Sequence, residues 1–191
     1  NPSAGGELWF TDGTTNATFL ARDIDLGSSS SIFGNFTGRF NYDEFTTVGN
    51  TFFFRADDGS TWREIWKSDG TTTGTVQVID HATGIFTSDP RYLTDVNGTL
   101  FFDSYGNSST RGLYTSAGTD VTTQLVPSGL AGVNLEDPTG IVALQNFAVF
   151  AVPRTTGSVD RSRELWISDG TSANTLPANT ARNTNLLDPQ G

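Results

Sequence analysis

The chain has 191 residues, a formal net charge of −10 and an isoelectric point near 4.3, which argues against a surface that binds nucleic acid or anionic lipid. Cysteine is absent, so disulfides and cysteine-ligated metal sites are excluded. No stretch approaches the ~20 apolar residues of a membrane-spanning helix. Many short apolar runs between Gly, Ser, Thr, Asn and Asp turns predict an all-β fold.

One short sequence motif, called the phrase below, occurs four times and defines the repeats of the chain. In its full form it is Glu-Leu-Trp or Glu-Ile-Trp followed by an Asp-Gly-Thr turn. Its aromatic residue is found at Trp9, Trp66, Tyr114 and Trp166, and its turn glycine at Gly13, Gly70, Gly118 and Gly170. A phrase that returns about every 50 residues indicates a repeat architecture. Because these residues recur with each repeat, we expect them to build the fold, and the phrase does not mark an active site.

The predicted strands follow the same order in each repeat. The chain opens at the third strand of the first repeat, at Glu7-Leu8-Trp9. Four strands are expected in each later repeat: 45–48, 51–56, 64–68 and 75–80; then 92–96, 99–102, 112–115 and 123–126; then 141–144, 147–152, 164–167 and a weaker one near 175–176. Gly, Asn or Asp occupies the connections, which is typical of hairpin turns.

Four antiparallel strands in ~40–50 residues are the size of one β-propeller blade. The second strands contain continuous apolar runs, at 52–54 and 147–150, and such runs suit strands that are buried on both faces. In the third strands, Leu8, Leu113 and Leu165 point away from the face of the aromatic residue. The sequence therefore predicts a β-propeller or propeller-like array of four-stranded antiparallel blades, with about three and a half blades in this chain.

The phrase resembles that of a bacterial repeat family with the consensus E-L-W-x-x-D-G-T. The match is specific in the first, second and fourth copies, while the third has Gly112, Tyr114 and Ala117 in place of Glu, Trp and Asp. The resemblance implies large secreted or surface proteins of bacteria that carry propeller-like arrays. It implies no established enzymatic activity.

A second mark, Asp-Pro, separates the repeats at Asp89, Asp137 and Asp188, with a degenerate form at Tyr42-Asp43-Glu44. We expect one propeller-like domain over residues 1–191, divided as follows: 1–42 a half blade with a long loop, 43–88, 89–136 and 137–188 one blade each, and 189–191 the start of a next repeat. Either the chain is a segment of a longer array, or a partner supplies the missing strands. In both cases a protein partner or further repeats would cover the open blade edges.

The long segment between the first two copies, residues 26–42, combines serines with several aromatic residues. It is interpreted as a plain loop or as a contact surface, because insertions in repeat proteins often form a binding face.

The acidic turns are the first candidates for chemistry. Asp12, Asp69 and Asp169 stand in the Asp-Gly-Thr turns, but calcium takes six to eight oxygen ligands and each turn offers one carboxylate. We expect Asx turns with glycine in a left-handed conformation, and no cofactor, with calcium as the alternative. Asp23 and Asp80 lie at the end of the fourth strand of their blades. Together with Asp25 or with Asp57-Asp58 they would contribute to a metal or sugar site. The other interpretation is that they are solvated carboxylates in turns.

The repeated glutamates are the second candidates. Glu7, Glu64 and Glu164 share a face with the aromatic residue that follows, and paired carboxyls ~5–10 Å apart hydrolyse glycosidic bonds. Catalytic residues are usually unique, so we expect structural bonds to neighbouring strands instead. His81 is the single histidine and carries no catalytic motif around it. The sequence thus favours a protein that is not an enzyme.

The function expected from these features is a non-enzymatic extracellular binding or scaffold module, adhesin-like, within a longer repeat protein or as an accessory subunit of a larger assembly. It would lie at the cell surface, be secreted, or lie in the periplasm. The alternative is a lectin-like propeller that binds glycans between its blades, and a polysaccharide-degrading enzyme is a third hypothesis. Neither nucleic acid nor a membrane span is expected.

Overall fold

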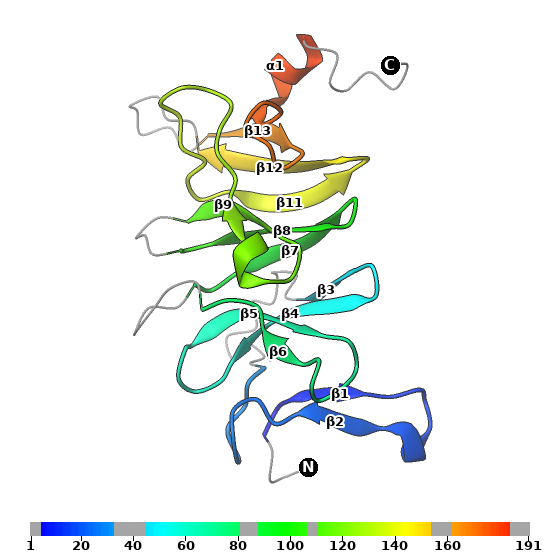
Figure 1. Ribbon diagram of the computed structural model, residues 1–191. Coiled ribbons are helices and arrows are strands. Elements are labelled where there is room, and N and C mark those ends of the chain that lie inside the picture. Colours follow the sequence, from blue (N-terminus) through cyan, green and yellow to red (C-terminus); the bar gives the residue numbers. More distant parts are fainter. Residues whose placement is uncertain (1–4, 33–44, 81–87, 107–110, 154–161, 184–191) are drawn as a thin grey trace.

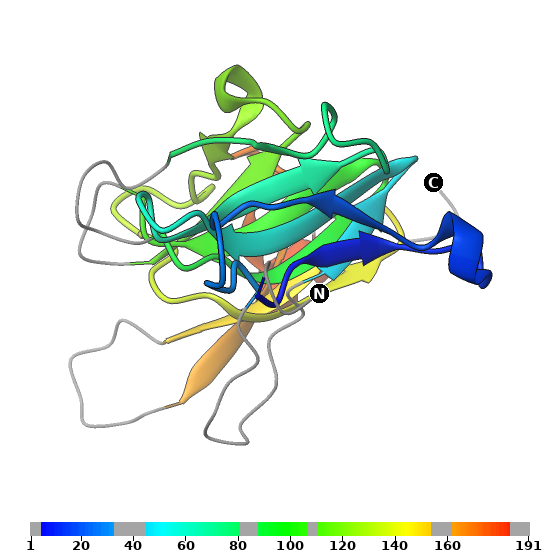
Figure 2. The same cartoon turned by 90° about the horizontal axis from the view of Figure 1, so that it is seen from below.

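The computed structural model describes residues 5–32, 45–80, 88–106, 111–153 and 162–183, and its sheets lie one above another along the chain (Figure 1). Strands dominate the described residues, and every strand pairing is antiparallel. The predicted all-β, propeller-like array of blades is confirmed. The view along the stack shows the sheets overlapping one another with a progressive twist (Figure 2).

Four sheets form the described part of the chain, and in each the strands follow one another in sequence order. The first blade is a two-stranded sheet of β1 (Leu8–Phe10) and β2 (Phe19–Arg22). The second blade contains β3 (Phe45–Val48), β4 (Thr51–Asp57), β5 (Arg63–Ser68) and β6 (Val76–Gln77). The third contains β7 (Arg91–Val96), β8 (Thr99–Ser104), β9 (Gly112–Ser116) and β10 (Gln124–Leu125), and the fourth contains β11 (Thr139–Leu144), β12 (Phe147–Pro153), β13 (Arg163–Ser168) and β14 (Leu176–Pro177).

Three short helical segments complete the described residues: the 3₁₀ turns η1 (Thr15–Ala17) and η2 (Asp120–Thr122), and the helix α1 (Ala178–Asn183). Among the residues described, no helix is both long and apolar enough to cross a membrane.

The fourth strands are shorter than the sequence suggests. β6 covers Val76–Gln77, whereas a strand over 75–80 was expected. The chain leaves the sheet early to become the linker to the next blade. One more backbone bond is kept, because the Val78 N–H donates to the Ile65 carbonyl at 2.8 Å, and Val126 donates to Leu113 in the same way.

The blades pack through two kinds of face. The aromatic face of a blade carries Trp9, Trp66, Tyr114 or Trp166, and the aliphatic face, on the other side of the same strand, carries Leu8, Ile65, Leu113 or Leu165. In each described interface, the aromatic face of one blade lies on the aliphatic face of the blade before it.

The interface between the third and fourth blades shows this order clearly. Phe150 and Trp166 of the fourth blade belong to one core cluster with Phe101 and Leu113 of the third. All four side chains are at most 3% exposed. Burial of this apolar area on both faces of the inner sheets is the main favourable term in the stability of the stack.

The same order holds one step earlier along the chain. Phe102 and Tyr114 of the third blade cluster with Phe53 and Ile65 of the second.

The first interface uses a charged side chain as well. Trp66 of the second blade clusters with Ile24 and is joined by Leu8 of the first blade. The Arg22 guanidinium lies 5.7 Å from the centre of the Trp66 ring, and its Nη1 donates to the Thr75 carbonyl at 2.8 Å. A cation over an indole adds to the packing of this smaller, two-stranded blade.

The linkers between blades dock on the sheet they leave through one backbone hydrogen bond. It joins Ile32 N to Gly6 O at 3.1 Å, Asp89 N to Arg63 O at 3.1 Å and Asp137 N to Arg111 O at 3.0 Å. Ile32 therefore takes, in the linker after the first blade, the place that Asp89 and Asp137 take in the later linkers. The proposed counterpart at Tyr42-Asp43-Glu44 lies outside the described residues, and the extra residues of this linker follow the docking point.

Candidate functional site

The Asp-Gly-Thr turns are closed by their own hydrogen bonds. Asp69 Oδ1 accepts from Thr71 N at 2.9 Å and from Thr71 Oγ1 at 2.7 Å, and the bonds of Asp12 and Asp169 to the following threonine are the same. The four turn glycines have φ between 91° and 95°. These are the Asx turns that the sequence suggests, and glycine suits such a φ because it has no Cβ.

The hydrogen bonds of the turns also act on the acidity of the carboxyl groups. The Thr14 hydroxyl and N–H hold the pKa of Asp12 below its usual value, and Thr71 does the same for Asp69. Burial raises the pKa of Asp169, but hydrogen bonds from Asn174 and Thr171 outweigh it and the pKa is lowered. The carboxylates are therefore committed to the turns as charged acceptors.

A hydrogen bond between two hydroxyl groups closes each turn, and we did not expect it from the sequence. The pairs are Thr11 with Thr18, Ser68 with Thr75, Ser116 with Thr123 and Ser168 with Thr175, at 2.7–2.9 Å. The first hydroxyl accepts the N–H of the turn glycine, and the second donates to the carbonyl of the turn threonine. The signal is readable in the sequence as Ser or Thr before the turn and Thr after it.

The third copy shows that the turn survives without its carboxylate. Ala117 stands at the Asp position, and Thr122 Oγ1 accepts from Ala117 N at 3.2 Å and from Thr119 N at 3.1 Å instead. Since a hydroxyl replaces the carboxylate, the role of this position in the third blade is to close the turn. In the part of the chain that is described, no group of three or more Asp, Glu or His side chains is placed to hold a metal ion.

Four of the carboxylates considered at the ends of the blades do come close together. Burial raises the pKa of Asp25, and the charges of Asp57, Asp58 and Asp23 raise it further. Asp57 Oδ1 accepts the Gly59 N–H at 2.9 Å. Asp80 is exposed and is not among these neighbours.

Asp58 differs from Asp25 within this group. Burial raises its pKa, but hydrogen bonds from Thr61 and Ser60 outweigh that effect and lower it. Asp23, Asp57 and Asp58 thus accept local backbone N–H groups, and at Asp25 the charges of these neighbours add to burial in raising the pKa.

Glu7 and Glu64 anchor the linkers between blades. Both are buried, and each accepts from the backbone N–H and the hydroxyl of a serine 24 residues later, Ser31 for Glu7 and Ser88 for Glu64. The sequence led us to expect bonds to neighbouring strands. The partner is instead the linker that leads to the next blade, because the strand neighbours satisfy one another through the ladder.

Glu164 has the same place in the fourth blade and is half-buried. The residue that would take the serine's place lies outside the described residues, as does His81.

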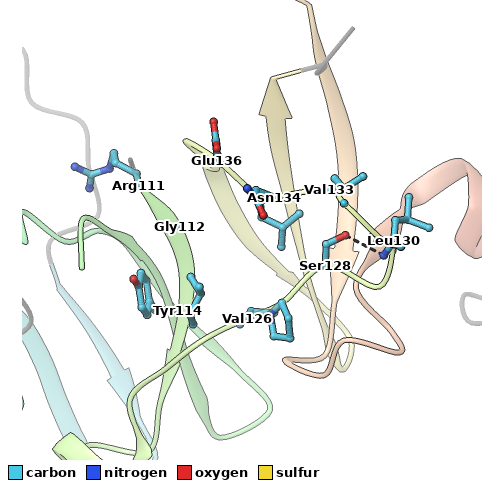
Figure 3. A pocket seen from close by; sticks show the side chains of 14 residues that line it. Arg111, Gly112, Tyr114, Val126, Ser128, Leu130, Val133, Asn134 and Glu136 are labelled. Atoms are coloured by element: carbon cyan, nitrogen blue, oxygen red, sulfur yellow. Dashed lines mark hydrogen bonds between the residues drawn. The ribbon is translucent and has the colours of Figure 1, made fainter. Parts of the chain in front are cut away.

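The third blade breaks the glutamate pattern and contains a cleft. Gly112 stands at the glutamate position, and Glu136 at the serine position, so the carboxylate has moved from the strand to the linker. A cleft of about 520 Å³ is lined by β9, β10 and the linker, and Leu125 of β10 is among its lining residues. Figure 3 shows Tyr114 on one side of it and Leu130 on the other. A Cβ added at Gly112 would lie 2.6 Å from Leu125 Cδ1.

The cation at the end of this cleft is held by other groups. Arg111 Nη2 lies 2.7 Å from Asp103 Oδ1, and the same nitrogen donates to the Asp89 carbonyl. Burial raises the pKa of Asp103, and the bond to Arg111 opposes it. Arg55 also pairs with Asp89, at 2.9 Å. Arg111 thus fixes the junction between the second and third blades, and its charge is engaged there.

Apolar side chains of the repeat that are buried in the middle of the stack are exposed in its first and last described blades. At the first blade, Trp9 is 41% exposed, whereas Trp66, Tyr114 and Trp166 are 4%, 8% and 3% exposed. A Cβ at Gly13 would meet no atom within 4 Å, whereas one at Gly118 would lie 3.1 Å from Phe53 Cζ of the preceding blade. No described blade covers the aromatic face of the first blade.

The fourth blade exposes the opposite kind of face. Leu165 is 57% exposed, while its counterparts Ile65 and Leu113 are 1% and 0% exposed. Val142 and Leu144 on β11 are 55% and 51% exposed on the same face, as their pairing with β12 requires. The expectation that the leucine face of the third strand is buried is therefore wrong for Leu165, because no described blade follows it.

The helix α1 covers part of that end. It packs against β13 and β14, and Ile167 on the aliphatic face is 1% exposed. The exposed residues of the aliphatic face lie on β11 and at the start of β13, whereas Ile167 further along β13 is buried. We call the exposed surface formed by Val142, Leu144 and Leu165 the aliphatic end face. We call the exposed surface of the first blade around Trp9 and Gly13 the aromatic end face.

The remaining repeat aromatics, Trp66, Tyr114 and Trp166, are buried between blades, and Tyr114 also lines the cleft of the third blade. Comparisons of the chain with protein-family models, with curated proteins and with solved structures find no match. Among the described residues, the two end faces and the cleft of the third blade are features that the packing of the repeat itself does not use.

Proposed function

We propose that this protein is a non-enzymatic binding or scaffold module that acts through protein contacts at the ends of its blade stack. The observation that carries the proposal is the exposure of Leu165 at 57% and Trp9 at 41%, at positions that are at most 8% exposed in the inner blades. Contiguous exposed apolar side chains rimmed by polar ones are typical of protein interaction sites.

The chemistry of the repeat supports a role that is not catalytic. Glu7 and Glu64, the carboxylates best placed to act as a repeated pair, are buried and accept hydrogen bonds from the linkers. Asp12, Asp69 and Asp169 are engaged in their turns. A general acid or base must instead reach the substrate directly.

The surroundings in which the module works belong to the same proposal. The E-L-W-x-x-D-G-T phrase resembles that of bacterial secreted and surface repeat proteins, and the net charge of −10 suits an exposed, well-solvated protein. We place the module outside the cytoplasm, at the cell surface, in the secreted fraction or in the periplasm. There it serves within a longer repeat protein or as an accessory subunit.

The test is to identify partners and map them to the end faces. The purified chain is immobilised, proteins of the source's secreted and surface fraction are retained, and each retained protein is purified and its binding remeasured. The proposal expects a partner whose binding falls at least tenfold with Trp9→Glu or Leu165→Glu. Leu26→Glu, at an 81% exposed site in the linker after β2, is the matched control and is expected to keep binding.

Two results would contradict the proposal. One is that every partner binds equally well to both end-face variants. The other is specific binding to a glycan array that survives both substitutions, which would favour the lectin-like alternative.

A further inference from the structure

We infer that the two end faces fit each other, so that a second copy of this chain docks head to tail, with its aromatic end face on the aliphatic end face of the first. This inference rests on the proposed function and names one partner for it. The interfaces that the chain already contains indicate this partner.

The three internal interfaces provide the template. In each, the phrase aromatic of the later blade reaches the cluster that contains the third-strand aliphatic residue of the earlier blade: Trp66 meets Leu8, Tyr114 meets Ile65, and Trp166 meets Leu113. Three different pairs of sheets repeat one arrangement although the side chains differ. The arrangement is therefore a property of the two faces.

The first and last described blades carry the two halves of a fourth such pair. Trp9 is the exposed aromatic without a described blade before it, and Leu165 is the exposed aliphatic residue without a described blade after it. Val142 and Leu144 widen the aliphatic side. Docking of Trp9 over Leu165 would continue the series of contacts across two molecules.

The Asp-Gly-Thr turn adds a second point of contact. In the inner blades this turn leans on the preceding sheet: Lys67 Nζ donates to the Gly118 carbonyl at 2.7 Å, and a Cβ at Gly170 would lie 3.4 Å from Thr115 Cγ2. Around Gly13 there is open space within 4 Å. The aromatic end face thus lacks its neighbour at the turn as well as at the tryptophan.

The contact is expected to be weaker than an internal one. In the described residues the first blade has two strands where the later blades have four, and α1 packs against β13 and β14 of the fourth blade. Small interfaces support reversible association. Since the contact joins two different faces, each added copy exposes the same pair of ends again, so that the complex grows as a series or closes into a ring.

The experiment measures sedimentation velocity of the purified chain alone between about 5 and 500 μM, a range that detects dissociation constants around the micromolar level. Wild type is expected to sediment faster as its concentration rises. Trp9→Glu and Leu165→Glu each lose one end face, so each alone is expected to stay monomeric over the whole range. Both sites are exposed, and circular dichroism verifies that the variants are folded.

Mixing the two variants is the decisive step. Trp9→Glu keeps the aliphatic end face and Leu165→Glu keeps the aromatic one, so their mixture is expected to form a 1:1 dimer that grows no further. Leu26→Glu, in the linker after β2, and Trp62→Glu, before β5 of the second blade, alter exposed side chains that belong to neither end face as defined, and both are expected to associate like wild type.

Three outcomes would overturn the inference. They are a wild-type chain that stays monomeric throughout, association that persists in either single variant, and a mixture of the two variants that forms no dimer. Persistence in Leu165→Glu would point to pairing of two aromatic end faces, and persistence in Trp9→Glu to pairing of two aliphatic ones. A monomeric chain that still binds another protein through its end faces would leave the proposed function intact.

Discussion

The middle and the ends of the stack are built from the same sequence pattern and differ in what surrounds them. Leu113 in the third blade and Leu165 in the fourth occupy equivalent positions of the third strand, yet one is 0% and the other 57% exposed. The alternation of a strand sets the face on which a side chain lies. Whether that face is buried is decided by the next blade, and the difference therefore marks the surfaces that the module offers to others.

The largest difference is expected between the two equivalent tryptophans. Trp66→Ala should lower the free energy of unfolding by about 3–5 kcal/mol, because a fully packed aromatic side chain is replaced by a cavity. Trp9→Ala should cost far less, because Trp9 is 41% exposed. Urea unfolding of both variants, followed by circular dichroism, measures the difference. Equal losses would show that the first blade is packed like the others.

Leu113 and Leu165 allow the same comparison of an inner with an outer blade on the aliphatic face. Leu113→Ala is expected to cost about 2–5 kcal/mol, and Leu165→Ala less than about 0.5 kcal/mol, as is usual for exposed sites. Both are measured by the same unfolding assay at low protein concentration, where the second copy does not contribute. A large loss for Leu165→Ala would contradict its place on an exposed end face.

The linker anchors give a smaller effect and compare the second blade with the third. Ser88→Ala removes a donor from the buried Glu64 carboxylate and should cost about 1–3 kcal/mol. Glu136→Ala, at the equivalent position beside Gly112, alters an exposed side chain and should change stability by less than about 0.5 kcal/mol. If Glu136→Ala is as destabilising as Ser88→Ala, the linker of the third blade is held by a contact that replaces the missing glutamate.

Replacing the indole by a phenyl ring sharpens the role of the phrase aromatic. Trp66 Nε1 is buried with no hydrogen-bond partner among the described residues, so the indole contributes through packing and not through its N–H. Trp66→Phe should therefore cost only about 1 kcal/mol, which corresponds to the lost volume. Thermal unfolding compares it with Trp66→Ala, and a loss as large as that of alanine would mean that the N–H is needed.

The smallest effect concerns pH. The pKa of Asp69 is lowered in the folded chain by its bonds to Thr71, so its contribution to stability is present above the unfolded pKa of about 3.9 and is lost as pH falls through the folded pKa. Asp69→Ala should lower stability at pH 7 and change it little near pH 2.

Asp25 serves as a control, because its pKa is shifted in the direction opposite to that of Asp69. Its pKa is raised by burial and by Asp57, Asp58 and Asp23, so its ionisation opposes folding and Asp25→Asn should stabilise the chain at pH 7. Urea midpoints across pH 2–7 measure both variants. A loss for Asp69→Ala that is the same at pH 2 and pH 7 would contradict the charge-dependent part of the turn.

Much of the fold could be predicted because the pattern is local. Strand alternation, the Asn97-Gly98 hairpin with φ of 50° and 82° and the Asx turns depend on residues a few positions apart. The partners of Glu7 and Glu64 could not be found in this way, because they are 24 residues distant in the linker. The exposure of Trp9 and Leu165 was also beyond prediction, since identical phrases differ only in their neighbours.

Hydrogen exchange at low and high protein concentration tests most directly the claim that the aromatic end face of one copy docks on the aliphatic end face of another. The account predicts slower exchange at high concentration in β1 and in the segments of β11 and β13, with unchanged exchange in the linker that borders the cleft of the third blade. Unchanged exchange at both ends, or protection confined to that linker, would contradict it.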